Sequence, residues 1–250
     1  TGRIANDSRG LVAQFTTTSS DTSLGSVVAQ AMRTSLGQSD AVRLVSASEI
    51  AGVLARMTMP TSTPLTLTTA RELAAREGIP LIVTGQVAAV GGGFMVTATL
   101  LGAESGETLV ELQQAADGPG ELLGAIDALA LDLRERIGES LRSVARAPRL
   151  QEATTGSLEA LREYTRGVEA GDLNGDWTRG LVHLRAAVTE DSTFASAWRK
   201  IAVYASNQGA AESEQFAAAS AAYRFRDRAI GSERAQIEAY YLQGVSTTRA

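Results

Sequence analysis

The chain has 250 residues and a formal net charge of −5, and 44% of its residues are hydrophobic. This length and composition suffice for one or two buried cores. The absence of cysteine excludes disulfides, thiolate zinc sites and a cysteine nucleophile. The basic residues form no stripe and aromatic residues are sparse, so nucleic acid is not an expected partner. No apolar run is long enough to predict a membrane-spanning helix.

Residues 1–145 alternate short apolar runs with stretches of helical periodicity. Strands are expected at 11–15, 42–45, 81–90, 94–101 and 108–115, the last three being antiparallel. Helices are expected at 24–36, 49–56, 68–78 and 122–144, the last as one long amphipathic helix. The segment 57–66 is rich in Pro, Ser and Thr and is expected to be a loop. This order predicts an α/β (α+β) domain, in which helices cover a mixed sheet.

A change of pattern marks the end of this domain. Residues 147–156 contain Pro148 and lack helical periodicity, which predicts a linker. The sequence therefore divides into a mixed α/β domain at 1–146, a linker at 147–156 and an all-α domain at 157–250. Ser157 or Thr155 is expected to cap the first helix of the second domain.

The second domain has the pattern of consecutive helix-turn-helix units. Apolar residues recur at helical spacing on three successive helices: Leu161, Tyr164, Val168; Leu181, Leu184, Ala187, Val188; Trp198, Ile201, Ala202, Ala205. A lone helix pair cannot bury such faces, so the pairs are expected to stack and to leave a groove. Trp198 is expected to be buried between the first two units, near Tyr164, Leu181 and Leu184. A third unit is expected to begin near Ser232.

These helical units resemble the tetratricopeptide repeat. Family positions fall on Leu161, Tyr164, Gly180, Leu181, Leu184, Ala187, Trp198, Ile201 and Ala202. The turn at 173–176 is about two residues longer than the family norm. The resemblance implies that the first helix of each pair lines a concave, partner-binding face. The groove residues that it implies are Glu159, Arg162, Arg166, Glu169, Arg199, Val203 and Asn207.

The arginines of that set allow two interpretations. Arg162, Arg166 and Arg199 can pair bidentately with carboxylates of a bound peptide or with its terminus. Alternatively, Arg162 and Arg166 form salt bridges with Glu159 or Glu163 on the same helix, which contribute little to stability. The first interpretation predicts a binding groove, and the second predicts a solvated helix surface.

The first domain resembles the amino-terminal domain of TolB and related curli-assembly and flagellar-accessory lipoproteins. The resemblance rests on the segments RLVSASEIAGVL, ARELAAREGIPLIVTGQV and VTATLLGAESGETL. The whole arrangement is similar to the carboxy-terminal sensory region of certain bacterial serine/threonine kinases and adenylate cyclases, through TTGSLEALREYTRG and AYRFRDRAIGSERAQIEAYY. The resemblance implies an extracytoplasmic (periplasmic or cell-surface) part of a membrane protein, although a cytoplasmic location stays open.

Several motifs have a structural explanation that we favour over a chemical one. The glycine run 91–93 is expected to form a hairpin turn, because a strand and not a helix follows it. Asp172, Asn174 and Asp176 have the spacing of a calcium loop, but Trp177 stands where that loop needs Gly. His183 is the single histidine, and no partners for a zinc site or a catalytic triad are recognised. No catalytic residue, metal site or cofactor is therefore predicted.

Two classes of function are compatible with these patterns. The first is a non-catalytic sensory or scaffolding region that binds a protein or peptide in the groove of the repeats. The second is a small-molecule sensor with its ligand in the α/β domain, near Ser46 and Thr84. An open groove lined by polar residues favours the first class, and a deep apolar pocket in the α/β domain favours the second. Because the sequence starts at Thr1, we expect a part of a longer protein, whose kinase or cyclase chemistry lies outside this chain.

Overall fold

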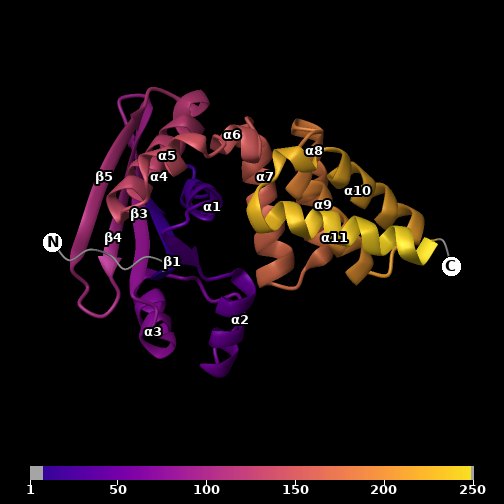
Figure 1. Cartoon of the computed structure of the whole chain (residues 1–250), viewed down its shortest axis with the longest axis horizontal. Helices are drawn as coiled ribbons and strands as arrows, with labels where there is room; N and C mark the ends of the chain where they lie inside the picture. The colour runs from indigo at the N-terminus through magenta and orange to yellow at the C-terminus, as the bar shows by residue number, and fades with distance from the viewer. Residues whose placement is uncertain (1–7, 249–250) are drawn as a thin grey trace. The chain divides into compact units, whose positions relative to one another are not determined.

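The computed structural model describes residues 8–248 of the chain, and the side chains of residues 8–244. The chain forms two compact units, Thr1–Arg149 and Leu150–Ala250. Unit 1 contains a mixed sheet with helices, and unit 2 is helical (Figure 1). The predicted fold class, a mixed α/β part followed by helices, is confirmed.

Within residues 8–248, five strands form one sheet in the order β2-β1-β3-β4-β5. Their bounds are β1 Ser8–Thr17, β2 Val42–Leu44, β3 Leu81–Val90, β4 Gly93–Gly102 and β5 Thr108–Ala116. β1 pairs in parallel with β2 and β3, whereas β3, β4 and β5 are antiparallel neighbours. Gly91 and Gly92 join β3 to β4 with φ values of 56° and 92°, so the glycine run forms the predicted hairpin turn.

Helices cover the sheet of unit 1. They are α1 Leu24–Leu36, α2 Ala47–Arg56, α3 Leu67–Glu77, the short 3₁₀ helix η1 Pro119–Glu121, α4 Leu122–Ile137 and α5 Leu141–Arg146. α1 and α4 pack against each other, and α1 also packs against β1 and α4 against β5 (Figure 1). Val96, Ala98 and Leu100 alternate along β4 and are fully buried. Their spacing of two residues places them on one face of the sheet, which is the apolar face.

One expected helix of unit 1 is wrong. The sequence predicted a single helix over 122–144, but α4 ends at Ile137 and α5 begins at Leu141. Gly138 adopts φ 109°, a left-handed conformation that terminates α4. Ser140 then accepts a hydrogen bond from the Ser143 backbone N–H and caps α5. The apolar spacing continues across this break, so periodicity alone did not reveal it.

Unit 2 is built from helices that pack each against the next. They are α6 Leu150–Ala153, α7 Leu158–Val168, the π-helical segment η2 Glu169–Leu173, α8 Trp177–Glu190, α9 Ala195–Asn207, α10 Glu212–Arg224, the 3₁₀ helix η3 Arg226–Arg228 and α11 Gly231–Thr248. Ser157 caps α7 as predicted, because its Oγ accepts the Ala160 N–H at 3.1 Å. The segment 147–156, expected as a linker, contains α6, in which Leu150 and Ala153 are buried.

The prediction that Trp198 is buried between the repeats is wrong. Trp198 is partly buried against the small cluster of Ala195, Ala222, Ala229 and Ile237, and its Nε1–H donates to the Ser192 carbonyl at 2.9 Å. Two other aromatic side chains, Tyr204 and Phe194, are each 1% exposed and fill the interior of the helical stack instead.

Glycines explain why Tyr204 takes this interior place. A Cβ on Gly171 would lie 2.3 Å from the Tyr204 ring, and a Cβ on Gly180 would lie 2.9 Å from it. The ring therefore fits closely against two backbone segments that have no side chain. Tyr164, expected near Trp198, packs on Phe194 with ring centroids 4.9 Å apart.

Candidate functional site

An open cavity of about 440 Å³ lies in unit 2 at the C-terminal end of α7 and the N-terminal end of α8. We call it the α7–α8 cavity. Its lining residues are Arg166, Glu169, Ala170, Asn174, Asp176, Arg179 and His183. All except Ala170 are polar or charged. Arg166 and Glu169 belong to the groove set that the sequence predicted.

The cavity owes its shape to the segment between the two helices. After Val168 the chain forms the π-helix η2 in place of a further α-helical turn, and a π-turn holds an extra residue. Gly175 then reverses the chain with φ 68°. Asp176 caps α8 by accepting the Arg179 N–H at 3.0 Å. The π-helical segment and the reversal at Gly175 therefore form the turn beside which the cavity lies.

Asp172 ties this segment to the next helix. The Tyr204 hydroxyl donates to Asp172 Oδ1 at 2.6 Å, and Lys200 forms an ion pair with the same carboxylate. Burial raises the pKa of Tyr204 far above its ordinary value, and the hydrogen bond to Asp172 raises it further. The tyrosine is therefore a neutral hydrogen-bond donor, and it fixes the turn that forms the cavity.

The carboxylates that suggested a calcium loop thus have other roles. Asp172 binds Tyr204 and Lys200, while Asp176 caps α8. Within the residues that the structure describes, no group of three or more His, Asp or Glu side chains could hold a metal ion.

Charges on one wall of the cavity are held in place by Glu163. This carboxylate accepts hydrogen bonds from Arg166 Nη1 at 2.5 Å and contacts His183 Nδ1 at 2.8 Å. Burial would raise the pKa of Glu163, but the hydrogen bonds from His183 and Arg166 outweigh it and lower the pKa. Glu163 is therefore ionised at neutral pH and orients both Arg166 and His183.

Two other charged groups at the cavity have no such partner. Arg179 is exposed, and its guanidinium forms no ion pair within residues 8–244. Glu169 is half-buried, and its carboxylate likewise has no ion pair in the described part of unit 2. The cavity thus offers one cation and one anion that a bound molecule can engage without displacing an internal partner.

The structure separates the other predicted groove residues from this cavity. Arg162 pairs with Glu159 one turn earlier on α7. Arg199 donates to Glu233 through Nε at 2.7 Å and Nη2 at 3.0 Å. Burial would lower the pKa of Arg199, but the Glu233 carboxylate raises it. Val203 is half-buried and Asn207 is exposed, both on α9. None of Arg162, Arg199, Val203 and Asn207 lines the α7–α8 cavity.

The internal salt bridges match the second interpretation of the arginines. Arg162 pairs with Glu159 and Arg166 with Glu163, each with a spacing of three residues along α7. Sequence reasoning missed Arg179 as a cavity residue because family register places groove residues on the first helix of a pair, and Arg179 begins the second. The long turn before it was the signal that pointed there.

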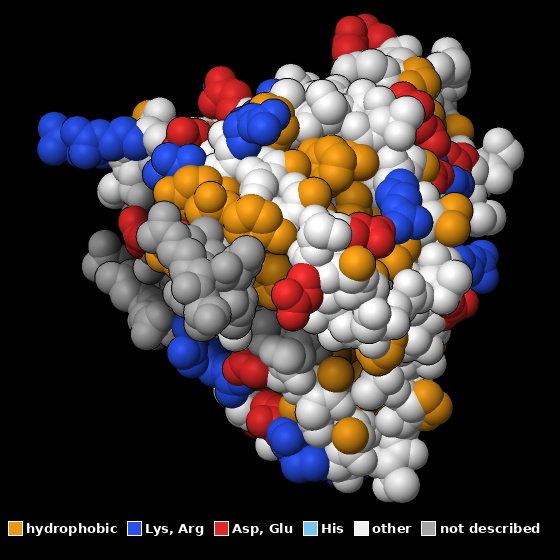
Figure 2. All heavy atoms as spheres, turned by 90° about the vertical axis from the view of Figure 1, so that its right-hand side faces the viewer, with side chains coloured by type: hydrophobic (Ala, Val, Ile, Leu, Met, Phe, Trp, Pro, Cys, Tyr) orange, Lys and Arg blue, Asp and Glu red, His pale blue; other side chains and the backbone are white. Residues whose placement is uncertain are grey.

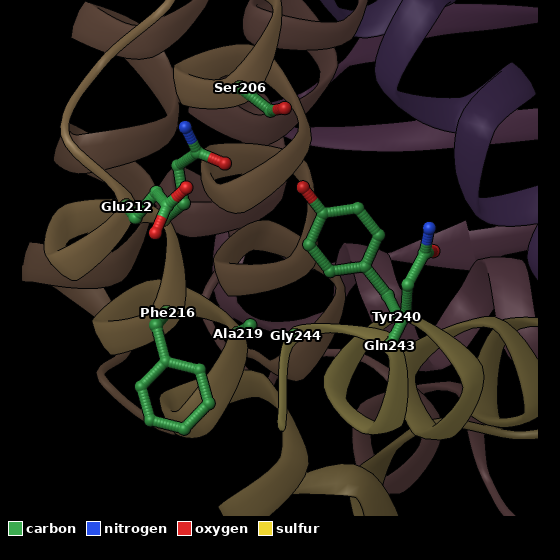
Figure 3. A pocket seen from close by; sticks show the side chains of 8 residues that line it. Ser206, Glu212, Phe216, Ala219, Tyr240, Gln243 and Gly244 are labelled. Atoms are coloured by element: carbon green, nitrogen blue, oxygen red, sulfur yellow. The ribbon is translucent and has the colours of Figure 1, made fainter. Parts of the chain in front are cut away.

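A second cavity, of about 310 Å³, lies between α9, α10 and α11. Its lining residues are Ser206, Glu212, Gln215, Phe216, Ala219, Tyr240, Gln243 and Gly244. Figure 3 shows the Phe216 and Tyr240 rings on either side of Ala219. Tyr240 donates to the Ala202 carbonyl at 3.2 Å, so its hydroxyl is already used within the fold. Figure 2 views the side of the molecule where α10 and α11 lie, and hydrophobic side chains gather there among charged ones.

In the α/β unit, the two residues predicted to lie near a small-molecule ligand, Ser46 and Thr84, use their hydroxyls in hydrogen bonds within the fold. The Ser46 hydroxyl accepts the Glu49 N–H at 3.2 Å and so belongs to the cap of α2. The Thr84 hydroxyl donates to the Gln14 carbonyl at 3.1 Å. Both hydroxyls therefore serve the fold, and neither residue lines the two cavities described above.

No protein-family model matches the chain, and no curated protein sequence matches it. Among solved structures, the C-terminal domain of LpoB from Escherichia coli is similar at 17% identity, covering 46% of this chain and 87% of that one, with a TM-score of 0.40. Lipoprotein GNA1162 from Neisseria meningitidis has 18% identity, covers 54% and 99%, and has a TM-score of 0.37. TolB from Acinetobacter baumannii has 14% identity, covers 54% and 30%, and has a TM-score of 0.35. At these values the similarities carry no conclusion about function.

Among the described residues, no helix is both long enough and apolar enough to cross a membrane.

Proposed function

We propose that this chain is a non-catalytic binding region, and that unit 2 binds a protein partner through a carboxylate-bearing peptide segment in the α7–α8 cavity. The observation that carries the proposal is the lining of the cavity, in which all residues except Ala170 are polar or charged. The charged side chains of this lining can bind the backbone and the charged groups of a peptide.

The charges of the cavity indicate which peptide fits. Arg179 forms no ion pair within residues 8–244, so a carboxylate can form charge-assisted hydrogen bonds with its guanidinium. Glu163 holds Arg166 at the same cavity, where the remaining N–H groups of its guanidinium can donate to a bound carboxylate. Glu169 can accept a peptide N–H or a basic side chain. A segment with a free carboxyl terminus, or with an Asp or Glu followed by a basic residue, meets these requirements.

The resemblance of the sequence to the sensory regions of bacterial serine/threonine kinases and adenylate cyclases supports a signalling context. On this proposal the chain is the extracytoplasmic part of such a protein, and partner binding at unit 2 regulates a linked domain. Ser46 and Thr84 use their hydroxyls within the fold, which weighs against the small-molecule alternative at those two positions.

A peptide display selection tests the proposal. The whole chain is screened against random peptides presented once with a free carboxyl terminus and once as carboxamides, with internal acidic residues allowed. We expect selected peptides to carry a carboxylate and to lose about tenfold or more in affinity when Arg179 is changed to Ala. Arg166→Ala should add to the loss.

Arg185→Ala is the matched control, because Arg185 lies on the same helix and pairs with Glu214 at 2.7 Å, away from the cavity lining. The Arg185→Ala variant should bind the selected peptides with the wild-type affinity. The proposal fails if no peptide is selected, if peptides that contain no carboxylate bind equally well, or if Arg185→Ala weakens binding as much as Arg179→Ala.

A further inference from the structure

The edge of the sheet formed by β5 is acidic, and no basic residue lies near it in the sequence. Between Arg76 and Arg134 the chain contains no Lys or Arg. β5 and the turns that flank it carry Glu104, Glu107, Glu111, Asp117 and Glu121, all of them exposed. Within the described part of unit 1, none of these carboxylates forms an ion pair. One cation lies at the turn before β5, where Arg71 donates to the Glu104 carbonyl at 3.3 Å, so the five carboxylates leave the edge with a net negative charge.

β5 is also an open edge. It pairs with β4 on one side, and no further strand of residues 8–248 pairs with its other side. Alternate residues of an antiparallel edge strand direct their N–H and C=O groups away from the sheet. β5 is nine residues long and contains no Pro, whereas β2 at the opposite edge is three residues long. β5 thus lacks the shortening and the prolines that usually protect such an edge.

The two faces of β5 differ in character. Val110 and Leu112 are half-buried on the side that α4 covers, and Glu111 and Gln113 are exposed on the other side. A strand added beside β5 would continue this alternation, since side chains of neighbouring strands line up on the same face. Its apolar side chains would extend the covered face, and its basic side chains would lie beside Glu111.

We propose that β5 binds an extended basic segment of a partner protein, which adds to the sheet as a further strand. Backbone hydrogen bonds supply the pairing, and the carboxylates around β5 select segments in which basic and apolar residues alternate. A second copy of this chain is a poor occupant, because pairing of two β5 strands brings two sets of acidic residues together. This surface lies in unit 1 and does not depend on the peptide cavity proposed for unit 2.

The probe is an eight-residue peptide in which Lys and Val alternate, titrated into the whole chain and followed by amide hydrogen exchange. We expect saturable binding that slows exchange in β5. A peptide with Glu in place of Lys should not bind. A Lys-Val peptide N-methylated at alternate residues has the same charge but cannot pair with the edge, so it should bind at least about tenfold more weakly.

Charge reversal tests the selectivity of the edge. Glu107→Lys combined with Glu111→Lys should weaken binding of the Lys-Val peptide by about tenfold. Glu135→Lys is the control, since Glu135 is an exposed residue of α4 that lies outside β5 and its turns. It should change affinity by less than about twofold. Circular dichroism of each variant checks that the sheet is intact.

The proposal is overturned if the Lys-Val peptide does not bind, if the N-methylated peptide binds equally well, or if exchange slows outside β5. It is also overturned if sedimentation shows a dimer of the chain that protects the β5 amides without added peptide. A loss with Glu135→Lys equal to that of the double variant would show general charge attraction in place of edge binding.

Discussion

The buried ion pair of unit 1 gives the sharpest stability prediction. Arg134 donates to Glu139 through Nε at 2.9 Å and Nη2 at 2.5 Å, and the two side chains are 1% and 2% exposed. Ser39 and Ser143 donate to the same carboxylate at 2.6 and 2.7 Å. Glu139 therefore joins the end of α4 to α5 and to the segment between α1 and β2.

Glu139→Gln leaves the Arg134 charge buried without its anion. Removing one partner of a buried pair typically costs about 3–5 kcal/mol, so the variant should lose that much stability at neutral pH. Glu72→Gln is the control, because Glu72 and Arg76 form an exposed pair on one helix at 3.1 Å. It should cost about 0.5 kcal/mol or less.

The pH dependence of the free energy of unfolding gives a second, independent estimate of how much the Arg134–Glu139 pair stabilises the fold. Burial would raise the pKa of Glu139, but the hydrogen bonds from Arg134, Ser39 and Ser143 outweigh it and lower the pKa from 4.5 to about 2. Because the folded-state pKa is the lower one, the stabilisation is present above pH 4.5 and is lost as the pH falls toward 2. The difference in pKa corresponds to about 3 kcal/mol.

Urea unfolding measured at several pH values tests both the stability lost in Glu139→Gln and the stability lost by the wild type in acid. Trp177 and Trp198 are the two tryptophans and both lie in unit 2, so fluorescence follows that unit, whereas far-UV circular dichroism follows both units. Glu139→Gln should lower the circular dichroism transition and flatten its acid dependence. The reasoning is refuted if the variant is within about 0.5 kcal/mol of wild type, or if it keeps the full acid dependence.

Three further predictions concern the helical unit and use urea unfolding followed by tryptophan fluorescence. Gly171→Ala should cost about 1–3 kcal/mol, because its Cβ would lie 2.3 Å from the Tyr204 ring; a cost near zero would show that the ring can move aside. Tyr204→Phe should cost about 1–3 kcal/mol, because Asp172 loses a partly buried, charge-assisted hydrogen bond of 2.6 Å; an unchanged midpoint would contradict this. Trp198→Ala should cost less than about 3 kcal/mol, since Trp198 is only partly buried, and a larger loss would restore it as a core residue.

Periodicity was sufficient to predict several strands and helices of the chain, although it missed the break between α4 and α5. The hairpin strands β3, β4 and β5 alternate and are joined by glycine turns, so their positions follow from sequence. The helices α1, α8 and α9 contain the apolar residues whose helical spacing predicted them. In these segments the local pattern and the tertiary packing demand the same structure.

The remaining features depend on contacts between distant parts of the chain. The partner of Arg199 is Glu233, 34 residues later, and no local pattern identifies that pair. The interior position went to Tyr204 and not to Trp198 because Gly171 and Gly180 make room for a ring at that point. Residue type and spacing do not show where such a gap forms. The predicted groove residues therefore stay a prediction, of which only Arg166 and Glu169 line the α7–α8 cavity.

The most direct test of the proposed function is isothermal titration of one selected peptide against four forms of the chain. The peptide is measured with its carboxylate and with that group converted to an amide. Wild type and Arg185→Ala should bind the carboxylate form equally and discriminate against the amide. Arg179→Ala, and Arg179→Ala combined with Arg166→Ala, should bind about tenfold or more weakly and lose the discrimination. Equal discrimination by all four forms would place the binding site outside the α7–α8 cavity and would contradict the account.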